Sequence, residues 1–180
     1  MLNKTAKCVV FLAFAGLLAA PALAEIQVRV STKSVSFNLE RRGAVTCYQT
    51  SLPENQAAAQ ATNATRKARG LAPVRANAEL AAVAARHACD MARRGVMSHR
   101  GSSSKGPMQR LKNEGYRPSI AAENIAAGPF TQQRVLQEWG RSSGHLANIL
   151  IPQVRHYGIG KAVGSDGKTV FWAAVYSAPR

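Results

Sequence analysis

The chain has 180 residues, 24 of them basic and 9 acidic, which gives a formal net charge of +15. This length suits one domain with a substantial core. The basic residues are scattered, lack interleaved aromatic side chains and form no nucleic-acid-binding motif, so specific nucleic-acid binding is not expected. The composition predicts a basic, solvated surface that attracts anionic material.

Residues 1–24 have the pattern of a secretory signal peptide. Lys4 and Lys7 give a positive start, Cys8–Ala20 is apolar, and Pro21–Ala24 forms a small-residue cleavage site. A membrane anchor is the alternative, but the apolar run is well short of the roughly 20 residues that a span needs. We expect cleavage after Ala24 and a secreted or periplasmic mature chain without a transmembrane segment. Loss of two lysines from +15 leaves +13.

Two cysteines remain after this processing, Cys47 and Cys89. Cysteines in an oxidising compartment usually pair, so we predict a Cys47–Cys89 disulfide, with two free buried thiols as the alternative. The long loop between them predicts a stabilisation of about 4 kcal/mol in the chain-entropy model.

Residues 25–56 differ in character from the rest and are predicted to form an N-terminal extension. Alternation of Ile26, Val28 and Val30 with polar residues favours a short strand. The polar remainder is expected to be held to the domain by Cys47.

From Ala57 onward the pattern is helical. The longest predicted helix covers 78–94, with Asn77 as its N-cap and Gly95 at its end. Three other segments are predicted to be helical, namely 57–69, 107–113 and 131–139.

The chain ends in a predicted β-hairpin, with strands at 157–163 and 169–176 and a turn at 164–167. Helices followed by a terminal antiparallel hairpin indicate an α+β fold in which helices cover a sheet.

A series of short motifs occurs in order along residues 57–180. They are Asn63-x-x-Arg66, Gly70-Leu71-x-Pro73, His87-Ala88-x-Asp90-Met91-Ala92, Ser98-His99-x-Gly101, Gly115-Tyr116, Ala122-Glu123-Asn124-Ile125-Ala126, Trp139-x-x-Ser142-x-Gly144-His145-x-x-Asn148-Ile149-Leu150 and Gly158-x-Gly160. In order and spacing they resemble the bacterial, SCP-domain branch of the CAP superfamily, which includes cysteine-rich secretory proteins, antigen five and plant pathogenesis-related proteins.

The resemblance implies a three-layer α/β/α sandwich for residues 57–180, with a surface cleft that carries two histidines and two acidic residues. His99 and His145 match the histidines, and Glu123 matches the first acid. Ser142 stands where the second acid is expected, three residues after the tryptophan. The full set of four is therefore incomplete in this chain, although serine is frequent at this place in the bacterial branch.

Two histidines and a carboxylate also match the ligands of an open zinc site, and neutral imidazole suits zinc, copper or nickel. His99, His145 and Glu123 are therefore the candidate metal ligands. No HExxH signature fixes their geometry, and the two histidines lie far apart in sequence, so their convergence depends on the resemblance.

The other two histidines are expected to be structural. His87 lies on the apolar face of the long helix and is predicted to be a packed, hydrogen-bonded core residue. His156 precedes the first hairpin strand. Glu123 has a similar alternative role, since it could only support its loop through backbone amides, a role that we also expect of Asn124.

Gly140–Gly144 fits the GxSxG pattern of a serine nucleophile. That pattern requires a strand, a tight turn and then a helix, whereas this segment follows a predicted helix. We interpret it as a loop.

Two classes of function remain open. The resemblance favours an exported binding protein whose cleft takes a lipid, a glycan or another envelope ligand, with a divalent metal as a candidate cofactor. The alternative is a hydrolase, either a protease or a nuclease. In it a metal held by His99, His145 and Glu123 would activate water, or His145 would act as a base for Ser142 or Ser143.

Overall fold

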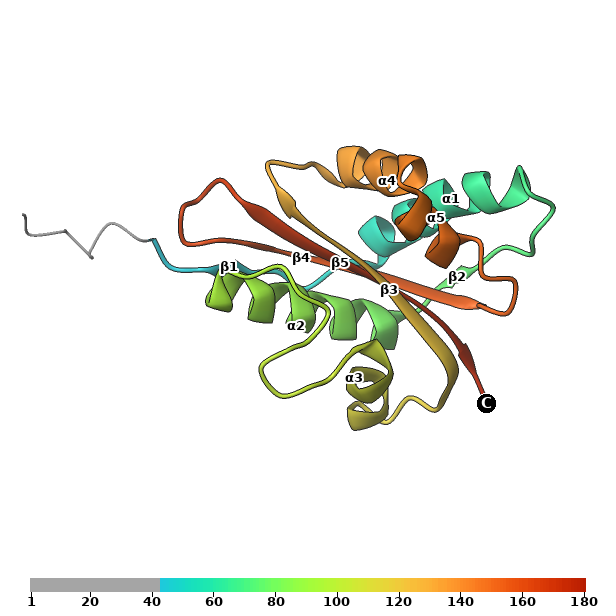
Figure 1. Cartoon of the computed structure of the whole chain (residues 1–180), viewed down its shortest axis with the longest axis horizontal. Helices are drawn as coiled ribbons and strands as arrows, with labels where there is room; N and C mark the ends of the chain where they lie inside the picture. Colours follow the sequence, from blue (N-terminus) through green and yellow to red (C-terminus); the bar gives the residue numbers. More distant parts are fainter. Residues whose placement is uncertain (1–42) are drawn as a thin grey trace, which may run out of the picture. The chain divides into compact units, whose positions relative to one another are not determined.

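The computed structural model describes residues 43–180 (Figure 1). The predicted signal peptide and the strand predicted around Ile26–Val30 lie outside these residues. Within the described part of the chain, no helix combines the length and the apolar character needed to cross a membrane.

Five strands and five helices make up the described part. In chain order they are β1 (Thr46–Cys47), α1 (Leu52–Lys67), β2 (Arg75–Ala76), α2 (Ala78–Arg94), α3 (Pro107–Asn113), β3 (Pro118–Gly128), α4 (Gln132–Arg141), α5 (Ser143–Ile149), β4 (His156–Val163) and β5 (Val170–Pro179).

The sheet has the strand order β1-β4-β5-β3, and β2 pairs with β4 in parallel. β4 and β5 form the predicted antiparallel hairpin, and β3 pairs antiparallel with β5 along nearly its whole length. Helices α2 and α3 cover one face of this sheet, while α1, α4 and α5 cover the other (Figure 1). The predicted α+β fold, a three-layer α/β/α sandwich with a terminal hairpin, is confirmed.

Strand β5 separates two hydrophobic cores. Its alternate side chains point to opposite faces of the sheet, because successive residues of a strand do so. Phe171, Ala173 and Val175 join the core under α2, and Trp172 and Tyr176 join the core under α1, α4 and α5. Burial on both faces explains why this strand is apolar almost throughout.

Helix α1 begins five residues before the predicted start at 57. Ser51 caps it by accepting a hydrogen bond from the Glu54 backbone N–H, and the Glu54 carboxylate accepts one in return from the Ser51 backbone N–H at 2.9 Å. This capping box satisfies two N–H groups at the start of the helix. The predicted start at 57 misses this cap, because residues 52–56 are as polar as the segment that precedes them.

Helix α2 has the predicted bounds. The Asn77 side chain accepts from the Leu80 N–H at 2.9 Å, and Gly95 ends the helix in the left-handed conformation. The predicted Cys47–Cys89 disulfide is present and joins β1 to α2, with a Cα–Cα distance of 5.2 Å.

Four elements were not predicted: β3, α5 and the two-residue strands β1 and β2. The segment 118–128 is rich in alanine and has no clear alternation, so its pairing with β5 was not legible. Helix α5 starts immediately after Ser142, which is both the C-cap of α4 and the N-cap of α5. The prediction of a loop at Gly140–Gly144 is therefore wrong: this segment is a junction between two helices.

Candidate functional site

The three candidate residues lie on separate elements that flank the edge strand β3. His99 lies in the loop between α2 and α3, Glu123 lies in the middle of β3, and His145 lies in α5. The sharp end of α2 at Gly95 begins the loop that carries His99, whereas Glu123 is fixed by the register of β3 against β5, where it pairs with Val175.

Glu123 is the centre of the cluster. It is only 4% exposed, and its carboxylate has a charged or polar partner on each oxygen. Oε1 lies 2.9 Å from His99 Nδ1, and Oε2 accepts a hydrogen bond from the Arg110 guanidinium. Arg110 also donates to the His99 carbonyl oxygen at 3.0 Å. Arg110 thus neutralises the buried carboxylate and anchors the His99 loop, a role that the sequence did not reveal.

His87 lies beneath this carboxylate. Its side chain is fully buried, and Nε2 is 3.6 Å from Glu123 Oε1. The predicted packing in the core is confirmed. Neither ring nitrogen makes a hydrogen bond of normal length and angle among residues 43–180, but the ring lies against the Glu123 carboxylate and the Ser98 backbone. Burial lowers the pKa of His87, and the nearby Glu123 carboxylate opposes that shift.

His145 approaches the cluster from α5. Its ring packs against Trp139 with a centroid separation of 6.4 Å, and its Nδ1 is buried without a partner among the described residues. Burial lowers its pKa, and the positive charge of protonated His99 lowers the pKa further. The His99 side chain, in contrast, is 56% exposed.

Two asparagines, the buried Asn124 and the half-buried Asn148, connect α5 to β3. Asn124 donates to the His145 carbonyl oxygen at 3.1 Å, and Asn148 donates to Asn124 Oδ1 at 2.8 Å and to the Glu123 carbonyl oxygen at 3.1 Å. Asn124 was expected to support a loop; it instead supports the helix that carries His145. The two amides therefore set the position of His145 relative to Glu123.

Ser142 is half-buried at the junction of α4 and α5, and its hydroxyl does not cap α5. The segment around it follows a helix, so it lacks the preceding strand of a nucleophile elbow. His156 begins β4 and lies 2.8 Å from the Tyr116 hydroxyl through Nδ1, which agrees with the structural role expected of it.

The arrangement limits how a metal could bind. Within residues 43–180 no group of three or more histidine, cysteine, aspartate or glutamate residues is placed to hold a metal ion. Both Glu123 oxygens already have partners, and a cation bound directly to them would lie beside Arg110. Glu123 fits better as the outer partner that orients His99 through Nδ1, which leaves the opposite ring nitrogen available.

An α/β/α sandwich with two histidines around a buried glutamate defines the class of this protein. The family model described as "CAP: Cysteine-rich secretory protein family" matches residues 59–176, and the chain belongs to this family.

Bacterial proteins are among its relatives. An uncharacterized protein of Bacillus subtilis, YkwD, is 34% identical over 99 residues, which cover 55% of this chain and 38% of that protein. The chain therefore matches well under half the length of this curated relative.

Two solved structures share the fold. An extracellular protein of Bacillus anthracis with an SCP domain has a TM-score of 0.60 and 25% identity, and the match covers 71% of this chain and 44% of that one. An outer surface protein of Borrelia burgdorferi has a TM-score of 0.62 and 17% identity, and the match covers 74% and 98% of the two chains.

Proposed function

We propose that this chain is an exported CAP-domain binding protein whose cluster at His99, Glu123, Ser142 and His145 binds a polar group of an envelope ligand, such as a lipid headgroup or a glycan. In this proposal residues 1–24 are a cleaved signal peptide and residues 25–56 form an extension. The extracellular SCP-domain relative supports a secreted or periplasmic location.

The burial and pairing of the Glu123 carboxylate are the observations that favour binding over catalysis. Its carboxylate is buried, and both oxygens are engaged, one by His99 and the other by Arg110. A general base must be free to accept a proton from the substrate or from a nearby water. Glu123 instead holds His99 in one orientation, which suits a rigid polar surface for ligand binding.

A divalent metal, with zinc as the first choice, would be held by His99 and His145. When bound, such an ion acts as a Lewis acid toward an oxygen ligand. Glu123 would orient His99 and keep its Nδ1 occupied. Because imidazole must be neutral to bind a metal, the affinity should fall in acid, and the lowered pKa of His145 keeps this ligand neutral further into the acid range.

Calorimetry with zinc tests the metal component. His99→Ala and His145→Ala should each remove most of the binding, whereas His156→Ala should retain it because His156 pairs with Tyr116 instead. Unchanged zinc binding in both of the first two variants would exclude this pair as the ligand set.

A specific observation also supports the alternative, a hydrolase. A histidine held by a buried carboxylate is the base-and-orienting pair of many hydrolytic sites. Casein, DNA, peptidoglycan and ester substrates should be tested for turnover with the purified protein. Turnover that survives purification and disappears in His99→Ala and His145→Ala would establish the hydrolase and refute binding as the main activity.

A further inference from the structure

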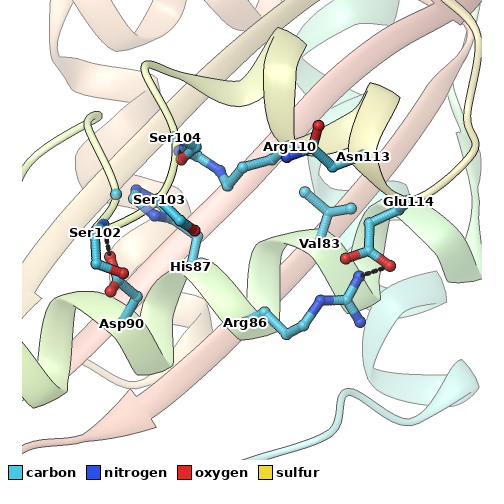
Figure 2. Close-up of a pocket in the computed structure, with 11 residues that line it drawn as sticks. Val83, Arg86, His87, Asp90, Ser102, Ser103, Ser104, Arg110, Asn113 and Glu114 are labelled. Carbon is cyan, nitrogen blue, oxygen red and sulfur yellow. Dashed lines mark hydrogen bonds and ion pairs between the residues drawn. The ribbon is translucent and has the colours of Figure 1, made fainter.

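A second polar pocket lies behind the Glu123 cluster. It has a volume of about 160 Å³, is open to solvent on one side and is lined by α2, α3 and the turn at 101–104 (Figure 2). Val83 supplies its one apolar side chain of any size, and the rest of the lining is polar or glycine. Neither His99 nor His145 lines it, although His87 and Arg110, which contact Glu123, form part of its wall.

The wall of this pocket contains buried nitrogen atoms that make no hydrogen bond of normal geometry. Among residues 43–180 this holds for both ring nitrogens of His87 and for the Nε of Arg110, although His87 Nε2 lies 3.6 Å from the Glu123 carboxylate. Figure 2 shows the His87 imidazole projecting from α2 toward Ser102, Ser103 and Ser104. A buried polar group whose hydrogen bonds are incomplete is costly, so such groups normally face a ligand or ordered water.

Gly101 leaves space among these polar atoms. A Cβ added at this position would lie 2.7 Å from Ser104 Oγ, 3.3 Å from Asp90 Oδ2 and 3.7 Å from His87 Nδ1. The missing side chain therefore leaves a small cradle that is surrounded by a hydroxyl, a carboxylate and an imidazole.

The ionised groups of the wall are already paired with one another or with neighbours. Arg86 pairs with Glu114 at 2.8 Å, Asp90 pairs with Arg94 at 3.0 Å, and Arg110 pairs with Glu123. No excess charge remains for an ionic ligand to neutralise. What remains are hydroxyl and imidazole groups, which can donate and accept, a carboxylate, which accepts, and a guanidinium, which donates.

We propose that this pocket binds a single neutral, polyhydroxylated ring, that is, one sugar residue. Its volume has room for about ten water-sized sites, which is far more than one bridging water and is comparable with one six-membered sugar ring. The serine hydroxyls and Asp90 would exchange hydrogen bonds with ring hydroxyls, and His87 would find the partner that it lacks. The pocket does not depend on the metal or on the polar ligand proposed for the cluster.

The test is an NMR titration of the full mature chain with N-acetylglucosamine and with glucose. Saturable shifts are expected at Gly101, Ser104 and His87, with a dissociation constant in the millimolar range. Gly101→Val should weaken the affinity at least about tenfold, because its side chain fills the cradle. Asn113→Ala, which removes an exposed lining amide, should weaken it less and leave the fold intact. Gln137→Ala, on the exposed side of α4, is the matched control and should bind like the wild type.

Several outcomes would overturn the proposal. Absence of saturable shifts would show that water alone fills the pocket. Equal affinity in Gly101→Val and Asn113→Ala would show that the sugar binds outside it. Displacement of the sugar by inorganic phosphate would indicate an anion site. Sugar binding that is lost in His145→Ala but kept in Gly101→Val would assign the sugar to the cluster. Sugar binding that persists in His145→Ala, with zinc binding lost, would support the pocket and leave it independent of the cluster.

Discussion

Glu123 is a buried carboxylate in a chain with a large excess of positive charge, and its stability there depends on its partners. Desolvating a carboxylate costs several kcal/mol unless an opposite charge and hydrogen bonds compensate. Arg110 supplies the charge and His99 supplies the second contact. At the scale of single residues, the cluster is therefore the ion pair Arg110–Glu123 with His99 as a second partner of the carboxylate. The imidazoles of His87 and His145 belong to the surroundings of this pair.

Removing the charge partner should be far more damaging than removing an exposed one. Arg110→Met leaves Glu123 buried without its cation and should lower the free energy of unfolding by about 3 kcal/mol or more. Urea unfolding at neutral pH measures this. Arg86→Met is the control, because it breaks the exposed Arg86–Glu114 pair and should cost less than about 1 kcal/mol. Equal losses in the two variants would contradict the compensation described here.

Acid should destabilise the protein through His87 and His145. Burial lowers both pKa values below the ordinary 6.5, so the folded state favours neutral imidazole. Their contribution to stability is complete above that value and is lost as the pH falls through the lowered folded pKa. His87→Leu should therefore lose less stability than the wild type between about pH 7.5 and about pH 5. Urea midpoints at both pH values decide this, with His156→Gln as the variant that should follow the wild type.

The sequence could predict some residues of the site and not others. His99, Glu123 and His145 carry family motifs, and these motifs locate them without any geometry. Arg110 lies in a short helix of ordinary composition, and its role arises only because α3 packs beside β3. His87 repeats with helical spacing among apolar residues, so its pattern matches the core equally well. Its proximity to Glu123 is a product of tertiary packing.

Strand β3 shows why some elements can be predicted from the sequence and others cannot. Helix α2 and the hairpin have strong local signals: a cap, a stop glycine and a turn. β3 consists mainly of small residues, and its outer edge is protected from other chains by side chains that pair with its carbonyl groups. Trp139 donates to the Ile125 carbonyl at 3.4 Å, and Asn148 donates to the Glu123 carbonyl. The backbone pairing with β5 makes this segment a strand, and these side-chain contacts support it. Both are long-range contacts that the local sequence pattern does not reveal.

Helix α2 lies unusually close to β4, and two glycines of the GxG motif permit this approach. A Cβ at Gly160 would lie 2.7 Å from the Ala84 carbonyl carbon and closer still to the Ala85 backbone. Since backbone atoms cannot give way as a flexible side chain can, Gly160→Ala should lower the free energy of unfolding by at least about 3 kcal/mol. Thermal or urea unfolding tests this.

The matched control for this prediction is Gly140→Ala in helix α4. A Cβ at Gly140 meets nothing within 4 Å, and alanine is the better helix former. This variant should gain about 0.5–1 kcal/mol. A Gly160→Ala protein as stable as the wild type would show that α2 and β4 separate more easily than the packing indicates.

Two cores and one disulfide hold the described part of the molecule together. The sheet separates the core of α2 and α3 from that of α1, α4 and α5, and Cys47–Cys89 ties the first strand to α2. The layer arrangement could be anticipated from the motifs and the hairpin. The sequence could not predict which helix covers which face of the sheet. That assignment depends on the pairing of β3 with β5, and the sequence pattern does not reveal β3.

The charge of the whole molecule should govern its attachment to surfaces. The net charge of +15, or +13 after removal of the predicted signal peptide, attracts anionic lipids and wall polymers. The screening length shortens from about 30 Å at 0.01 M salt to about 8 Å at 0.15 M, so this attraction should weaken strongly over that range.

Co-sedimentation of the mature protein with vesicles that contain an anionic phospholipid should therefore fall with added salt. Vesicles of neutral phosphatidylcholine should retain little protein at any salt concentration. His145→Ala should follow the wild type, because net charge rather than the cluster supplies this attraction. Sedimentation that is insensitive to salt, or equal on neutral vesicles, would instead assign attachment to a specific ligand at one of the two sites.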